Sequence, residues 1–356
     1  MTVSKNHLLL LILAWFVYQA CNTPLQSSIQ LPPSGEFFNQ LSDYGLTLPN
    51  QTGFAPAPQL IKYQVTNALF SDYALKERYV YLPEGKSAYL RTDGHFEWPE
   101  GSILLKNFCY NEAQLGKDQM METRLLIKEA KDWKAVSYQW DENYNDAKKS
   151  KLGDVIPMEI MHQEKTLAFD YIIPNKNQCK SCHNANEKIE PIGFKYANLN
   201  RKISLDGNEI SQIEYLSDKG IIDLTKDSEL PKTMVAYLDP SADVQDRALA
   251  YLDINCGHCH RPNGPGNTSG LFLQYNETRS NHLGICKPPV AAGKGAGGRS
   301  YDIQPGDAEQ SILYYRMLTQ DPGEMMPELG RSLVHEEGLE MIKQWINSLE
   351  GDCSSE

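Results

Sequence analysis

Two copies of one short motif constrain this chain of 356 residues more than any other feature. Residues 256–260 read CGHCH, and residues 179–183 read CKSCH. In each copy two cysteines flank two residues, and a histidine follows the second cysteine directly. Two thiols at this spacing can attach a haem through its vinyl groups, and the adjacent imidazole can then bind the iron. The chain is therefore expected to carry c-type haem twice.

A zinc site is the alternative interpretation of the two motifs, because cysteine and histidine also bind zinc. Each motif supplies three soft ligands, but no second C-x-x-C or H-x3-5-H segment completes either set. We therefore predict two covalently bound haem c groups, with the iron bound by the motif histidines. The predicted attachment residues are Cys179, Cys182 and His183 for the first haem, and Cys256, Cys259 and His260 for the second.

The second haem iron needs a ligand on its other face. Met326 precedes Pro327 just before the last predicted helix, where class I cytochromes c usually place a methionine ligand. Histidine–methionine ligation raises the reduction potential of a haem. We predict Met326 as this ligand, with Met325 and Met317 as the next candidates; a plain core role is the alternative for each methionine.

Residue types alone do not identify the corresponding ligand of the first haem iron. Met234 follows the first motif, and three candidates precede it, namely Met158, Met161 and His162. A five-coordinate iron with no ligand on this face is the remaining possibility.

The N-terminus resembles an export signal. Lys5 and His7 precede an apolar run over residues 8–18, which is too short to span a membrane. Ala20 precedes Cys21, as at bacterial lipoprotein cleavage sites, so residues 1–21 are predicted as a lipoprotein-type signal peptide; simple secretion is the alternative. Because bacteria attach haem c outside the cytoplasmic membrane, we expect a periplasmic, outer-membrane or cell-surface lipoprotein.

Three cysteines remain beside Cys21 and the haem motifs. In an oxidising compartment two of them can pair. Cys286 and Cys353 bracket the segment after the second motif, so they are predicted to form a disulfide. Cys109 lies in an apolar stretch and is predicted to be a buried free thiol.

The pattern of apolar residues predicts an α+β chain of several domains. A linker over residues 22–35 precedes a β-sandwich-like domain over 36–165, where short alternating segments are separated by turns. A first haem region over 166–238 and a second haem domain over 239–356 follow, and both are expected to be mostly α-helical. The second resembles a class I cytochrome c.

Local patterns place the motifs on these elements. Alternation over residues 167–173 predicts a strand that Pro174 ends shortly before the first motif. A helix is expected from about Asn208 to Gly220. Another helix, which begins after Ser241, leads into the second motif, and a last helix carries an apolar stripe over residues 339–349.

The resemblance to a known family extends beyond the motifs. Residues 122–125, 177–179, 247–256, 286–293 and 330–337 are similar to segments of a family of exported bacterial two-haem c-type cytochromes. The similarity covers nearly all of the chain after the predicted signal. It implies haem binding and electron transfer, and the occurrence of some relatives beside sugar-dehydrogenase-like or β-helix proteins implies a redox protein as partner.

A carrier of single electrons between an exported redox enzyme and a respiratory acceptor is the favoured function. The net charge of −12 argues against nucleic acid and against an anionic membrane surface as partners, so membrane contact is expected only through a lipid on Cys21. The alternatives are a two-haem peroxidase, with His95, His162 or Glu122 as the acid or base beside an open haem, and a redox-linked docking or sensing module.

Overall fold

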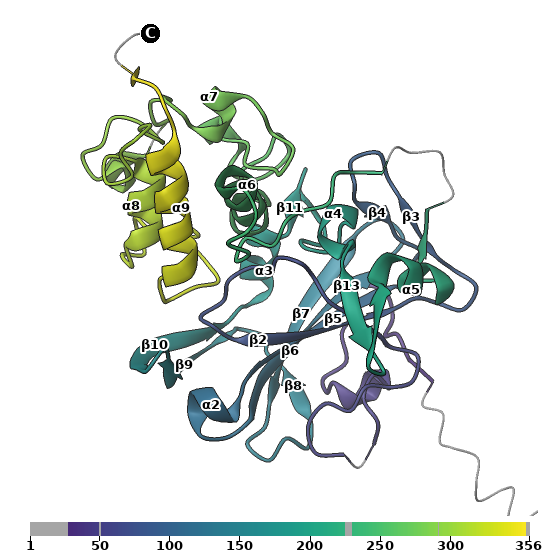
Figure 1. Ribbon diagram of the computed structural model, residues 1–356. Coiled ribbons are helices and arrows are strands. Elements are labelled where there is room, and N and C mark those ends of the chain that lie inside the picture. Colours follow the sequence, from purple (N-terminus) through teal and green to yellow (C-terminus); the bar gives the residue numbers. More distant parts are fainter. Residues whose placement is uncertain (1–27, 50, 225–229, 291, 354–356) are drawn as a thin grey trace, which may run out of the picture.

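The computed structural model describes residues 28–49, 51–224, 230–290 and 292–353. The predicted signal peptide and Cys21 lie outside these residues. The centre of the molecule is a six-stranded antiparallel sheet (Figure 1). In spatial order its strands are β1 (Ile61–Tyr63), β2 (Leu75–Tyr81), β5 (Ile103–Tyr110), β6 (Gln119–Lys128), β7 (Trp133–Trp140) and β8 (Ala147–Lys149).

Both faces of this sheet are covered, and each face carries its own core. On one face Tyr79, Leu105 and Leu125 pack against Leu41, Tyr44 and other apolar side chains of the N-terminal segment. On the other face Val80, Leu104 and Ala135 pack against residues that follow the first motif, Phe194 among them. Side chains alternate between the faces of a strand, so these strands, buried on both sides, have apolar residues at successive positions.

Four separate small sheets accompany the central one in the described part of the chain. They are the hairpins of β9 (Asp154–His162) with β10 (Lys165–Ile173), β11 (Asn184–Ala185) with β12 (Lys188–Ile189), and β13 (Lys202–Leu205) with β14 (Asn208–Ser211), and the sheet of β3 (Ala88–Leu90), β4 (Phe96–Glu97) and β15 (Ile222–Asp223). Strand β10 confirms the strand predicted just before the first motif.

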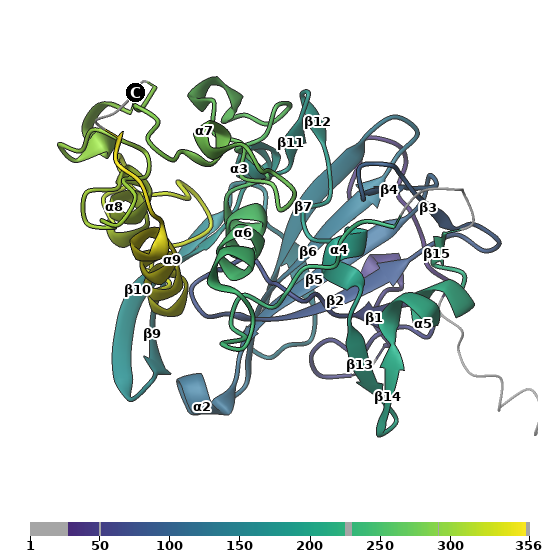
Figure 2. The ribbon, with the colours of Figure 1, turned by 45° about the horizontal axis from the view of Figure 1, so that its top comes forward.

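The helices are short and lie mainly in the second half of the chain. They are α2 (Glu112–Leu115), α3 (Lys176–Cys182), α4 (Tyr196–Leu199), α5 (Gln212–Asp218), α6 (Val244–Asn255), α7 (Ser280–Leu283), α8 (Ile312–Leu318) and α9 (Glu336–Ser348), with 3₁₀ turns at Ser42–Tyr44, Asn267–Ser269 and Gly293–Ala296. Figure 2 shows α6 and α9 side by side, next to the β-rich part. Helices α6 and α9 confirm the two helices predicted around the second motif and at the C-terminal end.

The predicted fold class is wrong. The described residues form fifteen strands in several sheets and eight α-helices, of which the longest has 13 residues. Neither predicted haem region is mostly α-helical: within the described residues of 239–353 the helices have only 12, 4, 7 and 13 residues. Stretches rich in glycine and proline, such as 261–270 and 321–330, themselves form turns and loops and separate the short helices.

Two further expectations are corrected, and one is confirmed. Residues 208–211 form strand β14 instead of the start of a helix, because they pair with β13; helix α5 begins only at Gln212. The β-rich region is one large sheet with small attached sheets, and no second large sheet faces it in the described part of the chain. Cys286 and Cys353 form the predicted disulfide, with a Cα–Cα distance of 5.1 Å.

Cys109 is free, as predicted, but half-buried instead of buried. It lies on β5, which is third in the spatial order of the central sheet, after β1 and β2. Within the described residues, every helix is too short or too polar to cross a membrane.

Candidate haem-binding pocket

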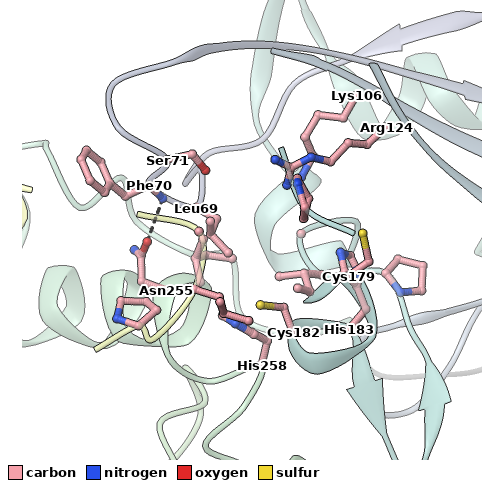
Figure 3. A pocket seen from close by; sticks show the side chains of 18 of the residues that line it. Leu69, Phe70, Ser71, Lys106, Arg124, Cys179, Cys182, His183, Asn255 and His258 are labelled. Atoms are coloured by element: carbon pink, nitrogen blue, oxygen red, sulfur yellow. Dashed lines mark hydrogen bonds between the residues drawn. The ribbon is translucent and has the colours of Figure 1, made fainter. Parts of the chain in front are cut away.

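One large pocket lies between the central sheet and the two motifs. Its empty space is about 1700 Å³, including the part that opens to solvent. Cys179, Cys182 and His183 of the first motif line it together with Cys256 and His258 of the second. Figure 3 shows side chains of both motifs around this space.

The first motif is held by a short, well-capped helix. Pro174 follows β10, and the Asn175 side chain accepts hydrogen bonds from the backbone N–H groups of Asn177 and Gln178 at the start of α3. Cys179 and Cys182 stand three positions apart on this helix, so both thiols share one face. The cap thus starts a helix of only seven residues that directs both thiols into the pocket.

His183 ends α3 with its ring orientation fixed. Its Nδ1 lies 2.7 Å from the carbonyl oxygen of Glu190. A carbonyl only accepts hydrogen bonds, so Nδ1 carries the hydrogen and Nε2 keeps a free lone pair. This arrangement of a ring nitrogen bonded to a backbone carbonyl is the one that orients metal-binding histidines.

The second motif follows α6 without a break. The backbone N–H of Cys256 donates to the carbonyl of Leu252, which closes the last turn of the helix. His260 Nδ1 lies 3.1 Å from Ser269 Oγ, and this hydroxyl itself donates to the Gly266 carbonyl. Nδ1 is therefore the donor here as well, and Nε2 is left free.

Close packing surrounds the His260 ring. A Cβ atom added at Gly266 would lie 3.2 Å from its Nδ1 atom. Cys256 lines the pocket, whereas Cys259 and His260 do not border it. The structure thus brings the first motif and Cys256 together on one pocket, whereas His260, the predicted ligand of the second haem, does not border it.

Both predicted iron-binding histidines are neutral near pH 7. Burial lowers the pKa of His183 to about 3, although its bond to the Glu190 carbonyl acts in the opposite direction. Burial and the charge of Arg316 lower the pKa of His260 to about 4. Neutral imidazole is the form that binds iron.

The four motif thiols are uncharged. Burial raises the pKa of Cys179 and Cys182, and it raises the pKa of Cys256 and Cys259 to about 12. In the described ranges no group of three or more His, Cys, Asp or Glu side chains could hold a metal ion. A structural zinc ion is bound by four such side chains, so the described residues offer no site of that kind.

Two of the three candidate methionines border the pocket. Met326 and Met317 line it, whereas Met325 is buried (8% exposed) away from it. The backbone N–H of Met326 donates to the carbonyl of Arg316 in α8, and Arg331 donates to the carbonyl of Met326. These bonds hold the predicted ligand Met326 at the pocket wall.

None of the four candidates for the remaining ligand of the first haem lines the pocket. Met234 is buried in the core around α6, and Met158, on strand β9, is buried in the core on which the β9–β10 hairpin packs. Met161 is 44% exposed, and His162 pairs with Glu337 at 2.9 Å. The sequence pattern does not indicate that these four side chains lie away from the pocket.

Cations of the sheet, which the sequence interpretation missed, face the first motif. Arg78, Lys106 and Arg124 line the pocket from strands β2, β5 and β6. Figure 3 shows Lys106 and Arg124 reaching from the sheet into the pocket, on the side of Cys179 and His183. No short-range pattern joins these residues, so only the strand pairing could have revealed them.

The two motif loops also contact each other directly. The backbone N–H of Asn186 donates to the carbonyl of Asn263 at 3.0 Å. Arg261, next to His260, donates to the Asn184 carbonyl and lies 3.5 Å from the carboxylate of Glu190. The Glu190 carbonyl also orients His183, so one small network links His183 to Arg261, the residue that follows His260.

Comparisons with known proteins add no relative. No protein-family model, no curated protein and no solved structure matches this chain.

Proposed function

We propose that this protein is a di-haem c-type cytochrome that carries single electrons between an exported redox enzyme and a respiratory acceptor. The observation that carries the proposal is that the first C-x-x-C-H motif and Cys256 of the second border one pocket, with the two motif loops hydrogen-bonded to each other. A chain that has to keep two redox groups close together needs such an arrangement. The resemblance to exported two-haem cytochromes supports the same function.

The residues present fit haem c. Each motif offers two uncharged thiols for thioether bonds and a neutral imidazole with Nε2 free. The residues that would hold the two groups are Cys179, Cys182 and His183 for the first, and Cys256, Cys259, His260 and Met326 for the second. Haem iron, when bound, supplies reversible one-electron chemistry, which Met326 ligation would shift to higher potential.

The remaining parts of the proposal concern partners and location. The proposed partner is a redox protein, for example an exported dehydrogenase of the same compartment, which would dock with this acidic chain. We propose export and attachment to a membrane only through a lipid on Cys21, without contact to nucleic acid.

A peroxidase is the second candidate, and one observation favours it. Of the three proposed acid or base residues, only Glu122 is close to the pocket: it is fully buried and pairs with Arg124, which lines the pocket near the first motif. His162 instead pairs with Glu337, and His95 does not border this pocket. A carboxylate–arginine pair beside an open haem could handle the protons of a peroxide reaction.

Spectroscopy of the purified protein separates these functions. A pyridine haemochrome assay should count two haems per chain, and both should vanish when the motif cysteines are changed to serine. Absorption and EPR spectra of both oxidation states, followed by peroxide addition, should show two six-coordinate low-spin haems without peroxide turnover. A high-spin haem that consumes peroxide would support the peroxidase instead.

Met326→Ala tests the ligand assignment. We expect loss of the methionine-to-iron charge-transfer band and a lower midpoint potential for one haem only, because a soft neutral ligand is removed. Met325→Ala, which removes the neighbouring methionine that does not border the pocket, should keep the band. An unchanged spectrum in the Met326 variant would show that another residue is the ligand.

A further inference from the structure

Three cationic side chains stand in one row across the central sheet. Arg78 on β2 pairs directly with Lys106 on β5, and Lys106 pairs with Arg124 on β6. Directly paired residues point to the same face of a sheet, with Cβ atoms about 5 Å apart, and like charges at this distance repel each other. All three residues line the pocket that contains the first C-x-x-C-H motif.

The neighbouring rows on this face do not balance the charge. One of them holds Lys76 opposite Phe108 and Glu122, and the other is apolar, with Val80 opposite Leu104. On strands β2, β5 and β6 these three rows thus hold four cations and a single carboxylate. Nitrogen or carbon atoms of Lys76, Lys106 and Arg124 all lie within 5.7 Å of the centre of the Phe108 ring.

That single carboxylate is engaged through one of its oxygens. Glu122 Oε1 pairs with Arg124 and accepts a hydrogen bond from Tyr171, whereas the buried Oε2 has no hydrogen-bond partner among the described residues. Lys76 donates to the Leu69 carbonyl, and Arg78 donates to the Lys76 carbonyl. The ammonium group of Lys106 makes no hydrogen bond or ion pair with any described residue.

The electrostatics of the pocket support an anionic occupant. Burial, together with the charges of Arg78 and Arg124, lowers the pKa of Lys106 to about 7. Burial lowers the pKa of Arg78 as well. Arg124 Nε, a strong donor, has no partner although it is buried. Buried donors and charges of this kind are costly unless a ligand or a counter-ion completes them.

We propose that Arg78, Lys106 and Arg124 form a carboxylate-binding site on the sheet face opposite the first motif. Planar guanidinium groups bind carboxylates with two parallel hydrogen bonds, and a lysine between them adds a point charge. The carboxylates have two possible sources. One source is the propionates of a haem attached at Cys179 and Cys182, and this source rests on the proposed function. The other is a free carboxylate ligand of the pocket.

The test uses the holoprotein and a variant that removes the two cations without an ion-pair partner, Arg78→Gln with Lys106→Gln. Arg124 is kept, because its loss would leave Glu122 buried without a counter-charge. Lys62→Gln, which removes an exposed cation of β1 outside this pocket, is the matched control. Lys106→Arg preserves the charge and should behave as the unchanged protein.

Two measurements distinguish the sources. If the propionates occupy the site, the resonance Raman propionate bending bands shift in the double variant, and the midpoint potential of one haem falls because nearby positive charge is lost. If a free carboxylate occupies it, those bands stay, while succinate, used as probe, binds the unchanged protein by calorimetry and binds the double variant at least ten-fold more weakly.

Unchanged Raman bands together with no succinate binding would overturn the proposal. Its failure is separable from that of the proposed function, because the haemochrome assay counts the haems independently. If no haem is attached at Cys179 and Cys182, the succinate titration alone decides whether the site exists. If the double variant folds poorly, the single variant Lys106→Gln takes its place in both measurements.

Discussion

Asp72 joins two segments that lie 260 residues apart. Its Oδ1 atom accepts hydrogen bonds from the backbone N–H groups of Ser332 and Leu333, each at 2.7 Å. The residue is 5% exposed and has a left-handed φ of 49°. Among residues other than glycine, Asp and Asn adopt this conformation most readily. The contact fixes the loop before β2 against the segment that leads into α9.

This carboxylate makes stability depend on pH. Burial raises the pKa of Asp72 to about 6, from an ordinary value of 3.8, although its two backbone hydrogen bonds act in the opposite direction. Between these two values the folded protein keeps a proton that the unfolded chain releases. The contribution of Asp72 to the free energy of unfolding therefore falls as pH rises through this range. The total fall is about 3 kcal/mol, because the two pKa values differ by about two pH units.

Asp72→Asn should remove this pH dependence. The amide oxygen can still accept from Ser332 and Leu333, but no charge forms at neutral pH. We expect the variant to match the unchanged protein near pH 4 and to exceed its free energy of unfolding by up to about 3 kcal/mol at pH 7, measured by urea denaturation across that range. Asp72→Ala, which loses both hydrogen bonds, should be less stable at every pH, by about 1–3 kcal/mol. Parallel pH profiles for the Asn variant and the unchanged protein would contradict the assignment.

At the scale of elements, the crossing of α6 and α9 builds the core beside the second motif. Tyr251 of α6 packs against α9 at Gly338, and a Cβ atom at Gly338 would come within 2.4 Å of the Tyr251 ring. The neighbouring Ile342 and Trp345 are almost completely buried in the same core. A glycine in the first turn of α9 thus allows the two helices to approach closely.

Gly338→Ala tests this packing through the sign of its effect. Alanine in a helix is ordinarily more stable than glycine by about 1 kcal/mol. Because the added methyl group meets the Tyr251 ring, we expect the opposite, a loss of about 1–3 kcal/mol, measured by thermal and chemical unfolding. The loss should shrink when Tyr251→Leu makes room for the methyl group. A stabilised Gly338→Ala protein would show that the helices are not in close contact.

At the scale of the whole molecule, the disulfide closes the C-terminal part of the chain. Cys286 and Cys353 are 67 positions apart and bracket α8 and α9. A cross-link over such a loop lowers the entropy of the unfolded chain, by an amount equivalent to about 4 kcal/mol of stability. The bond therefore secures the region that holds Met326 against the pocket.

Removal of this cross-link should destabilise the protein. We expect Cys286→Ser with Cys353→Ser to lose about 2–5 kcal/mol in the free energy of unfolding, measured by guanidinium denaturation. Cys109→Ser, which removes the free thiol, should change the value by less than about 1 kcal/mol. Peptide maps with and without reductant should show the Cys286–Cys353 link, and a link from Cys109 to either residue would contradict it.

Features set by neighbouring residues could be predicted from the sequence alone. The C-x-x-C-H segments, the alternating strand before Pro174, the helix that leads into Cys256 and the apolar stripe of α9 all have short-range patterns. The disulfide was also predicted, because few cysteines were left to pair. Hydrogen-bonding and side-chain periods of this kind act over a few residues, so the linear order is enough to reveal them.

The tertiary structure alone decided what depends on pairing between distant segments. Residues 208–211 became a strand because β13 offered a partner, and this overrode their helical spacing. The row of Arg78, Lys106 and Arg124 exists only through the register of three strands, since a shift by one residue would turn a side chain to the other face. The pocket that the first motif shares with Cys256 likewise results from the packing of α3 and α6 beside the sheet, a long-range contact that no local pattern encodes.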